Sequence, residues 1–413
     1  MSNLKQKELD VYVYFPKEKP ILLSRRLICN AELVCESKLE KGKSAVEKIE
    51  IERFKLRDIE QVMRNQGWEM GAKAQSLWFS GKAYQLPKDA KKGSEAEINV
   101  INDVLHNAIE PDFVDWEWLL SFDIVREKLA WLLMTREMHT AKNIYDPNML
   151  EYYGAHPIQH NIYSNSAKNS LADNFKSDKD IDNNRFGYRF GKDILRNFKN
   201  SIYVFRKEIE NVYFYHRYWQ FQYIPVGDRV FEKPFTENSI EDWFAAFGSF
   251  TLNVAPYEIE ILEIEKDVYK VNILQVAIYA RDTFDFNGNQ YLGFWNKNGV
   301  ILPIKESFRQ AMFLGVNSFL SNFKRFSIDT EFNSEVDYAI NNPLLVNGEN
   351  INKDLYFPVN NSDYRMWREN SKLRDPNGIG FGRDMILFSK MRIESVENLS
   401  IIVRISDERD IEK

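Results

Sequence analysis

The sequence predicts an α+β protein in which a helical N-terminal region precedes a β-rich domain with a curved antiparallel sheet or open barrel. Three observations support this prediction. Apolar residues recur at helical spacing in residues 57–163, whereas aromatic and β-branched residues alternate with polar ones in much of residues 201–284. Aromatic residues make up 14% of the 413-residue chain, and such rings are enriched in strands.

Residues 1–56 are expected to form N-terminal strands, because "DVYVYFP" (10–16) and "VEKIEIERFKL" (46–56) alternate apolar and polar positions. The helical region of residues 57–163 follows. Asp58 is expected to be the N-cap of a helical stretch that forms two helices broken at Gly67. Further helices are predicted over 94–109, where Ser94 and Glu97 have capping-box spacing, and over 113–134.

Residues 164–185 are rich in Ser, Asn, Asp and Lys, which predicts a flexible loop or linker. Residues 186–413 are then expected to form the β-rich α+β domain. The predicted strands are 201–226, 250–265, 268–284, 383–393 and 399–406. The predicted helices of this domain are 192–200, 239–250 and 305–323.

Composition narrows the classes of function. A formal net charge of −6 gives no general attraction to phosphate backbones, so no nucleic-acid partner is expected. The N-terminal "MSNLKQKELDVYVYF" lacks the pattern of a signal peptide, and no apolar run is long enough to cross a bilayer. We therefore expect a protein that is cytoplasmic in the producing cell and is exported, if at all, without a cleavable signal.

Searches for common catalytic motifs exclude several enzyme classes. The sequence contains no GxSxG, P-loop, HExxH or CxxC motif, and "GIGFG" (378–382) lacks the flanking strand and helix of a dinucleotide site. His156 and His160 have a spacing that can bind a metal, but Pro157 argues against a regular helix there. His216 and Arg217 fall within a predicted strand, on opposite faces, where His216 is either a packed residue or a base.

The densest group of polar and aromatic residues is "YARDTFDFNGNQYLGFW" (279–295), interpreted as a strand, a turn at "NGN" and a second strand. Asp282 and Asp285 would lie on opposite faces of a regular strand, so a bulge near Thr283 is needed to bring them together. Convergent carboxylates would supply an acid and a base. Two alternatives are a divalent cation bound by Asp285 and its Asn neighbours, and carboxylates that cap a hairpin whose aromatic residues pack a sheet.

Two resemblances to known families extend this interpretation. The segments "MRNQGWEMGAKAQSLWF" (63–79), "DWEWLLSF" (115–122) and "YARDTFDFNGNQYLGFWN" (279–296) resemble a bacterial family of unknown function encoded beside type VI secretion genes, over about residues 55–405. This resemblance implies an effector, or a protein associated with one. Its implied partners are an immunity protein and a spike or tube component of the secretion machine.

The "DTFD" at 282–285 is similar to the Asp-x-Tyr-Asp signature of the colicin M family, whose members cleave the lipid-linked peptidoglycan precursor at its pyrophosphate. The resemblance implies catalytic roles for Asp282 and Asp285. Tyr291 and Leu292 stand where that family has a His-Arg pair, so a cation would come from Arg281, His216 or Arg217.

The resulting prediction is an antibacterial type VI effector that hydrolyses an envelope substrate. The alternative is a non-enzymatic protein, either a membrane-perturbing toxin or a structural adaptor of the secretion apparatus. The apolar faces of 113–134 and 308–323 motivate the membrane version.

Overall fold

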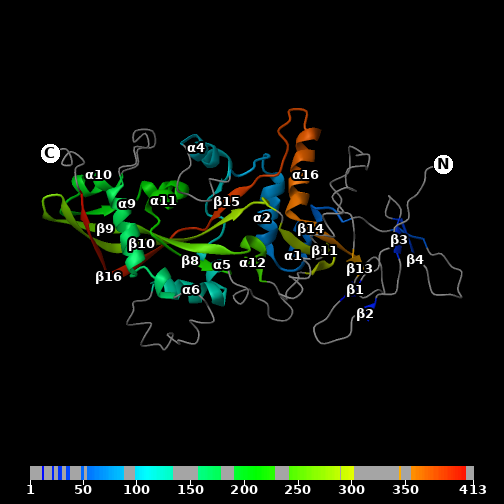
Figure 1. Cartoon of the computed structure of the whole chain (residues 1–413), viewed down its shortest axis with the longest axis horizontal. Helices are drawn as coiled ribbons and strands as arrows, with labels where there is room; N and C mark the ends of the chain where they lie inside the picture. Colours follow the sequence, from blue (N-terminus) through cyan, green and yellow to red (C-terminus); the bar gives the residue numbers. More distant parts are fainter. Residues whose placement is uncertain are drawn as a thin grey trace. The chain divides into compact units, whose positions relative to one another are not determined.

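The protein is described by a computed structural model (Figure 1). It covers residues 54–87, 98–133, 157–177, 190–227, 241–288, 290–301, 344–345 and 355–405, with short strands between residues 12 and 50. Two compact units are each assembled from separate stretches of chain. Unit 1 comprises Met1–Ala83 and Phe286–Arg383, and unit 2 comprises Tyr84–Asp285 and Asp384–Lys413. The predicted α+β class and the curved, mainly antiparallel sheet are confirmed.

The sheet of unit 2 is built around two long strands, β9 (Phe250–Glu265) and β10 (Val268–Phe284), which pair antiparallel and confirm the predicted strands. The register shifts between Ile273 and Gln275, and such irregularities bend a strand and increase its twist. The curl of the sheet follows from this bend.

Shorter strands complete the sheet on both sides of the β9–β10 pair. Its order is β6-β15-β10-β9-β7, with β16 also paired to β10 and β8 also paired to β9. The pairing of β15 with β6 is parallel and the other described pairings of this sheet are antiparallel. The bounds are β6 (Ile109–Glu110), β7 (Ser201–Val204), β8 (Gln222–Val226), β15 (Met385–Phe388) and β16 (Arg392–Arg404).

Helices pack on this sheet, with α9 against β16, α6 against β8 and α11 against β9 (Figure 1). The predicted helices at 192–200 and 239–250 are confirmed as α10 and α12, whereas 305–323 lies outside the described residues. The helices of unit 2 are α4 (Ile98–Asn107), α5 (Trp116–Leu120), α6 (Asp123–Leu133), α9 (Asn165–Lys176), α10 (Gly191–Asn197), α11 (Val212–Trp219) and α12 (Asp242–Phe247).

The flexible loop predicted for 164–185 is wrong over its first half, where α9 forms. The hydroxyl of Ser164 accepts a hydrogen bond from the backbone N–H of Ala167 at 3.1 Å and caps the helix. Ala167, Leu171 and Phe175 are fully buried at a spacing of four residues. This narrow apolar stripe is hidden in a polar composition, which explains the wrong prediction. Residues 178–189 lie outside the described part of the chain.

The single long helix predicted over 113–134 is two helices, α5 and α6, with a break at Ser121 and Phe122. The carboxylate of Asp115 caps α5 by accepting from Trp118 N at 2.9 Å. The apolar side chains of both helices are largely inside the unit, including those of Trp116, Leu119, Val125, Leu129, Trp131 and Leu132. Among the described residues, no helix has the length and apolar character required to span a membrane.

Unit 1 contains the predicted helix pair, α1 (Asp58–Asn65) and α2 (Glu69–Ser80), and the break is confirmed at Gly67, whose φ is 77°. Asp58 is the first residue of α1 and not its N-cap, which is Arg57. The third helix is α16 (Asn361–Arg374). The strands are β11 (Tyr291–Asn296), β12 (Gly299–Ile301), β13 (Leu344–Leu345) and β14 (Leu355–Asn360), with β1 (Tyr12–Val13), β2 (Ile21–Leu22), β3 (Leu27–Cys29), β4 (Val34–Ser37) and β5 (Lys48–Glu50) nearer the N-terminus.

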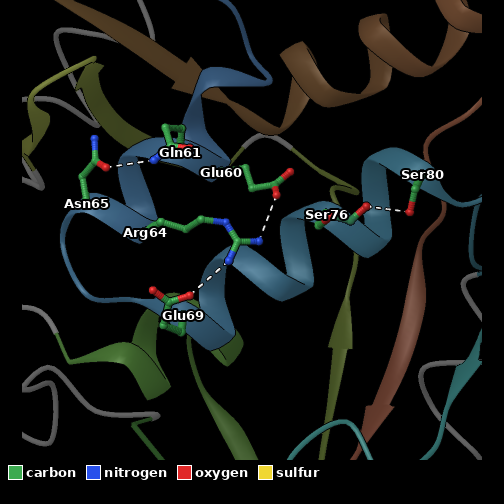
Figure 2. Close-up of polar contacts among 7 residues, drawn as sticks. All are labelled: Glu60, Gln61, Arg64, Asn65, Glu69, Ser76 and Ser80. Atoms are coloured by element: carbon green, nitrogen blue, oxygen red, sulfur yellow. Dashed lines mark hydrogen bonds and ion pairs between the residues drawn. The ribbon is translucent and has the colours of Figure 1, made fainter.

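Polar side chains on the outer surface of α1 and α2 form a local network (Figure 2). Arg64 donates to Glu60 at 3.1 Å and to Glu69 at 3.0 Å. Gln61 donates to the side chain of Asn65 at 2.9 Å. These groups are exposed, and exposed pairs of this kind contribute only about 0.2–1 kcal/mol each. The network therefore supports the helix pair and is not a candidate site.

Candidate functional site

The strand predicted over residues 201–226 is wrong in its centre, because residues 212–219 form the helix α11. The side chain of Asn211 caps this helix by accepting from Phe214 N at 3.1 Å. His216 and Arg217 therefore lie in the last turn of a helix and not on opposite faces of a strand. The run of Tyr, Phe and Trp residues has high strand propensity, but the cap and the packing of the helix override it.

Aromatic side chains fix α11 against the sheet. The hydroxyl of Tyr215 donates to the carbonyl oxygen of Pro256 in β9 at 2.6 Å. The Trp219 ring packs edge-on against Phe205 and Phe175, with centroid distances of 4.6 and 5.3 Å. Tyr215 and Trp219 are both buried. The remaining side chains of α11 are thus presented to β10 in a defined orientation.

His216 contacts β10 directly. Its Nδ1 lies 3.1 Å from the hydroxyl oxygen of Tyr279, and its ring packs against both Tyr279 and Phe388, with centroid distances of 5.8 and 5.9 Å. Burial lowers the pKa of His216 well below 6.5, and the charges of Arg281 and Arg217 lower it further. The imidazole is therefore neutral at neutral pH.

Arg281 lies two residues beyond Tyr279 on β10, so its side chain is on the same face of the strand as the residue that meets His216. Its backbone is paired with Thr251 of β9 on one side and Phe388 of β15 on the other. Burial lowers the pKa of Arg281 and the charge of Asp282 raises it, but a guanidinium remains protonated at neutral pH. A fixed positive charge is therefore held beside a neutral imidazole.

Arg217 brings a second guanidinium to the same place. Burial raises the pKa of Tyr213, whereas the charges of Arg217 and Arg281 lower it, so both cations lie near this phenol. Burial likewise raises the pKa of Tyr218, and Arg217 lowers it. The two phenols, the two guanidiniums and the imidazole form one group, which we call the α11–β10 cluster: Tyr213, His216, Arg217, Tyr218 and Arg281.

The two predicted catalytic carboxylates, Asp282 and Asp285, are not part of this cluster. Residues 281–284 of β10 pair with residues 388–385 of β15 without a register shift, so the bulge proposed near Thr283 is absent from this pairing. Asp282 therefore lies on the face of β10 opposite to Arg281. Asp285 follows the last residue of β10, and its backbone N–H donates to the carbonyl of Thr283 at 3.1 Å. Of the five predicted residues, Arg281, His216 and Arg217 come together.

The hairpin predicted over residues 279–295 is wrong, because β10 and β11 belong to different sheets. β11 pairs with β12 and β14 in unit 1. The backbone between the two strands is held by α16, where Arg365 donates to the carbonyl of Phe286 at 2.7 Å and Asn361 donates to that of Asn287 at 2.9 Å. The aromatic residues of this motif do pack a core: the Phe286 ring stacks on Tyr364 with centroids 3.5 Å apart.

Among the described residues, no group of three or more His, Cys, Asp or Glu side chains could hold a metal ion. The cation site predicted from Asp285, Asn287 and Asn289 has mainly amide ligands and stays a prediction. Asn289, one of the predicted oxygen ligands, lies outside the described residues, as does His156. His160 is in a short 3-10 helix, and its Nδ1 lies 2.9 Å from the carbonyl oxygen of Tyr223. His160 therefore has a backbone partner at the end of this short helix.

Unit 1 contains a shallow hollow of about 430 Å³ beside α16. None of the predicted site residues lines it. Its walls are formed by Arg57, Trp367, Asn370, Ser371, Arg374, Asp375, Pro376 and Phe381.

The sequence interpretation missed Tyr213, Tyr218 and Tyr279, which complete the surroundings of His216 and the two arginines. One signal for them was present. Asn211 is a favourable N-cap, and a helix that starts there places Tyr213 and Arg217 one turn apart on the same face. The alternating aromatic pattern concealed this signal.

Comparison with known proteins identifies the family but not the activity. The family DUF6402, described as a family of unknown function, matches residues 54–399. No curated protein and no solved structure matches the chain. Because the family match covers most of the sequence, from α1 to β16, the chain belongs to this family of unknown function.

Proposed function

We propose that the protein is an antibacterial effector of a type VI secretion system that hydrolyses a phosphate-bearing envelope substrate, such as the lipid-linked peptidoglycan precursor. The observation that carries the proposal is that Arg217 and Arg281 both lie close enough to His216 for their charges to lower the pKa of this buried imidazole. Two guanidiniums at one point are suited to bind phosphate oxygens and to stabilise the charge that develops on them during hydrolysis.

In the proposed reaction, Nε2 of neutral His216 accepts a proton from water as the water oxygen bonds to phosphorus and the bridging P–O bond breaks. Nε2 is the acceptor when Nδ1–H donates to the Tyr279 hydroxyl oxygen, which lies 3.1 Å away. The arginines stabilise the non-bridging oxygens and the departing oxygen. This assignment shifts the role of base from the carboxylates to His216, since Asp282 lies on the other face of β10. Asp285 is the remaining carboxylate candidate.

Delivery by a type VI machine is supported by the resemblance of residues 63–79, 115–122 and 279–296 to a family encoded beside such genes. The partners in this proposal are a spike or tube component that carries the protein and an immunity protein that protects the producing cell. The substrate class is supported by the "DTFD" similarity at 282–285 and by the two arginines.

The test is to express the full chain in the periplasm and, separately, in the cytoplasm of a sensitive bacterium. We expect toxicity from the periplasm, loss of toxicity in Arg281→Gln and Arg217→Gln, and full toxicity in Arg404→Gln, a matched change at an exposed position of β16. Absence of periplasmic toxicity would contradict the proposal. So would undiminished toxicity in a double Arg217→Gln, Arg281→Gln variant with a native circular dichroism spectrum.

Dye release from liposomes, hydrolysis of lipid-linked substrate and copurification separate the non-enzymatic alternatives. A membrane-perturbing toxin would release dye from liposomes without hydrolysing lipid-linked substrate. The 113–134 segment gives this version less support than its sequence did, because it is two helices whose apolar residues are largely buried. A structural adaptor would be harmless in both compartments and would copurify with a spike or tube component.

A further inference from the structure

Three polar atoms of the α11–β10 cluster are buried without a hydrogen-bond partner in the described part of the protein. They are the hydroxyl oxygens of Tyr213 and Tyr218 and the Nε of Arg281. A buried polar group left without a partner costs about 1–3 kcal/mol. Such groups are rare in folded proteins, so three of them in one cluster require an explanation.

The three atoms belong to side chains whose pKa values depend on neighbouring charged groups of the cluster. Tyr213 is influenced by both Arg217 and Arg281, and Tyr218 is influenced by Arg217 and by Tyr213. The Tyr218 ring is held between Phe190 and Phe214, with centroid distances of 5.5 and 5.6 Å. The phenols are thus fixed by packing. The charge of Arg217 and a hydrogen-bonding interaction with its side chain lower the pKa of both phenols, but no contact of either hydroxyl has the distance and angles of a full hydrogen bond.

Other buried hydroxyls of the protein behave differently. Tyr203 donates to Glu208 at 2.8 Å, Tyr215 to the carbonyl of Pro256 at 2.6 Å and Tyr364 to Gln75 at 3.0 Å. The fold therefore satisfies tyrosine hydroxyls elsewhere, including one on α11 itself. Among the described residues, Tyr213 and Tyr218 are the tyrosines whose buried hydroxyls lack a partner.

All the groups that converge here can donate hydrogen bonds. They are two phenol O–H groups, an arginine Nε–H and the guanidinium of Arg217. A ligand that satisfies them must carry several acceptor oxygens and negative charge. A phosphoryl group offers three such oxygens, whereas a carboxylate offers two. His216, Arg217, Tyr218 and Arg281 are half-buried, so the cluster reaches the surface of unit 2.

We infer that Tyr213, Tyr218, Arg217 and Arg281 bind one phosphoryl group, with the two phenols as direct hydrogen-bond donors. This inference rests on the proposed function and defines the chemical group of its substrate that the cluster recognises. Tyr213 and Tyr218 are binding residues in this site. His216 lies beside the bound group, where its neutral ring adds no charge.

Titration of the full-length protein with inorganic phosphate and with pyrophosphate tests the inference, with acetate at equal ionic strength as the comparison. We expect both phosphates to shift the NMR signal of the Arg281 Nε–H group, assigned with an Arg281→Lys variant, and acetate to leave it in place. The double variant Tyr213→Phe, Tyr218→Phe should bind phosphate about tenfold more weakly, because each lost hydrogen bond to a charged group contributes appreciably. Tyr223→Phe, at an exposed position of β8, should bind as the native protein does.

Several results would overturn the inference: no shift with either phosphate, equal shifts with acetate, or native affinity in the folded double phenylalanine variant. If the double variant unfolds, the single variants Tyr213→Phe and Tyr218→Phe provide the same comparison. Failure of the inference is distinguishable from failure of the proposed function. Periplasmic toxicity without phosphate binding overturns only the inference, and phosphate binding by a harmless protein overturns only the proposed function.

Discussion

The Nδ1 of His216 lies 3.1 Å from the hydroxyl oxygen of Tyr279, which joins the last turn of α11 to the centre of the long strand β10. Tyr279 is fully buried, and burial raises its pKa, so the phenol stays protonated. Arg281 is the next residue on the same face of the strand. The pair therefore holds the imidazole in a fixed position beside a permanent positive charge.

The pH dependence of stability should reflect this environment. Burial, Arg281 and Arg217 hold the pKa of His216 below its value of about 6.5 in the unfolded chain. The unfolded state therefore binds the proton more readily, and the stabilising contribution is fully present above about pH 6.5 and is lost as the pH falls toward the folded pKa. Urea unfolding between about pH 7.5 and 5 should show a steeper loss for the native protein than for His216→Gln.

His106→Gln, an exposed change on α4, serves as the control and should retain the native slope. Identical slopes for the native protein and His216→Gln would show that the imidazole is not shielded in the folded state.

The hydroxyl of Tyr213 should contribute nothing to stability when no ligand is bound. Removing it in Tyr213→Phe eliminates a buried group without a partner, so the free energy of unfolding in phosphate-free buffer should stay constant or rise by about 1 kcal/mol. Tyr215→Phe on the same helix should lower it by about 1–3 kcal/mol, because the hydrogen bond to the carbonyl of Pro256 is lost. Equal destabilisation by both changes would mean that Tyr213 has a partner in the native state.

The cap of α11 should couple helix stability to anion binding. In Asn211→Ala, the backbone N–H of Phe214 loses its acceptor, which should cost about 1 kcal/mol. Fraying of the first turn would also displace Tyr213, so phosphate affinity should fall in the same variant. Ser164→Ala removes the corresponding cap of α9 and should reduce stability by a similar amount without changing phosphate affinity. An unchanged phosphate affinity in Asn211→Ala would show that the cap of α11 does not position the phosphate-binding residues.

Local pattern was sufficient for the two longest strands and insufficient for α11 and for α16, the longest described helix, which was not predicted. The alternation in β9 and β10 extends over whole strands and predicts them correctly. In α11 the aromatic residues favour a strand locally, and the decisive contacts of Tyr215 with Pro256 and of Trp219 with Phe175 involve residues distant in sequence. Such tertiary contacts cannot be seen in a window of neighbouring residues.

The residues of the candidate site were likewise predictable only in part from local sequence. Arg281, His216 and Arg217 could be selected from the sequence as chemically suitable groups, although their grouping depends on α11. The orientation of Asp282 and Asp285 could not be predicted, because it depends on whether β10 contains a bulge near Thr283. β11 pairs with β12 and with β14, which is far away in sequence, so the turn pattern alone predicted the wrong partner for β10.

The close approach of α10 to α9 depends on the absence of a side chain at Gly191. A Cβ atom there would lie 2.3 Å from the Cα of Phe175 and 2.4 Å from the carbonyl oxygen of Asn174, and these backbone atoms cannot move without separating the helices. Gly191→Ala should therefore lower the free energy of unfolding by about 1–3 kcal/mol or more, measured by urea denaturation. Gly299→Ala is the matched control, because the nearest atom to its Cβ is the side-chain nitrogen of Gln66 at 3.6 Å, an ordinary contact.

Since the Phe175 ring also packs on Trp219, separation of α9 from α10 should disturb α11 and weaken phosphate binding in Gly191→Ala but not in Gly299→Ala. A stable Gly191→Ala variant with native phosphate affinity would show that α9 does not hold α11 in place.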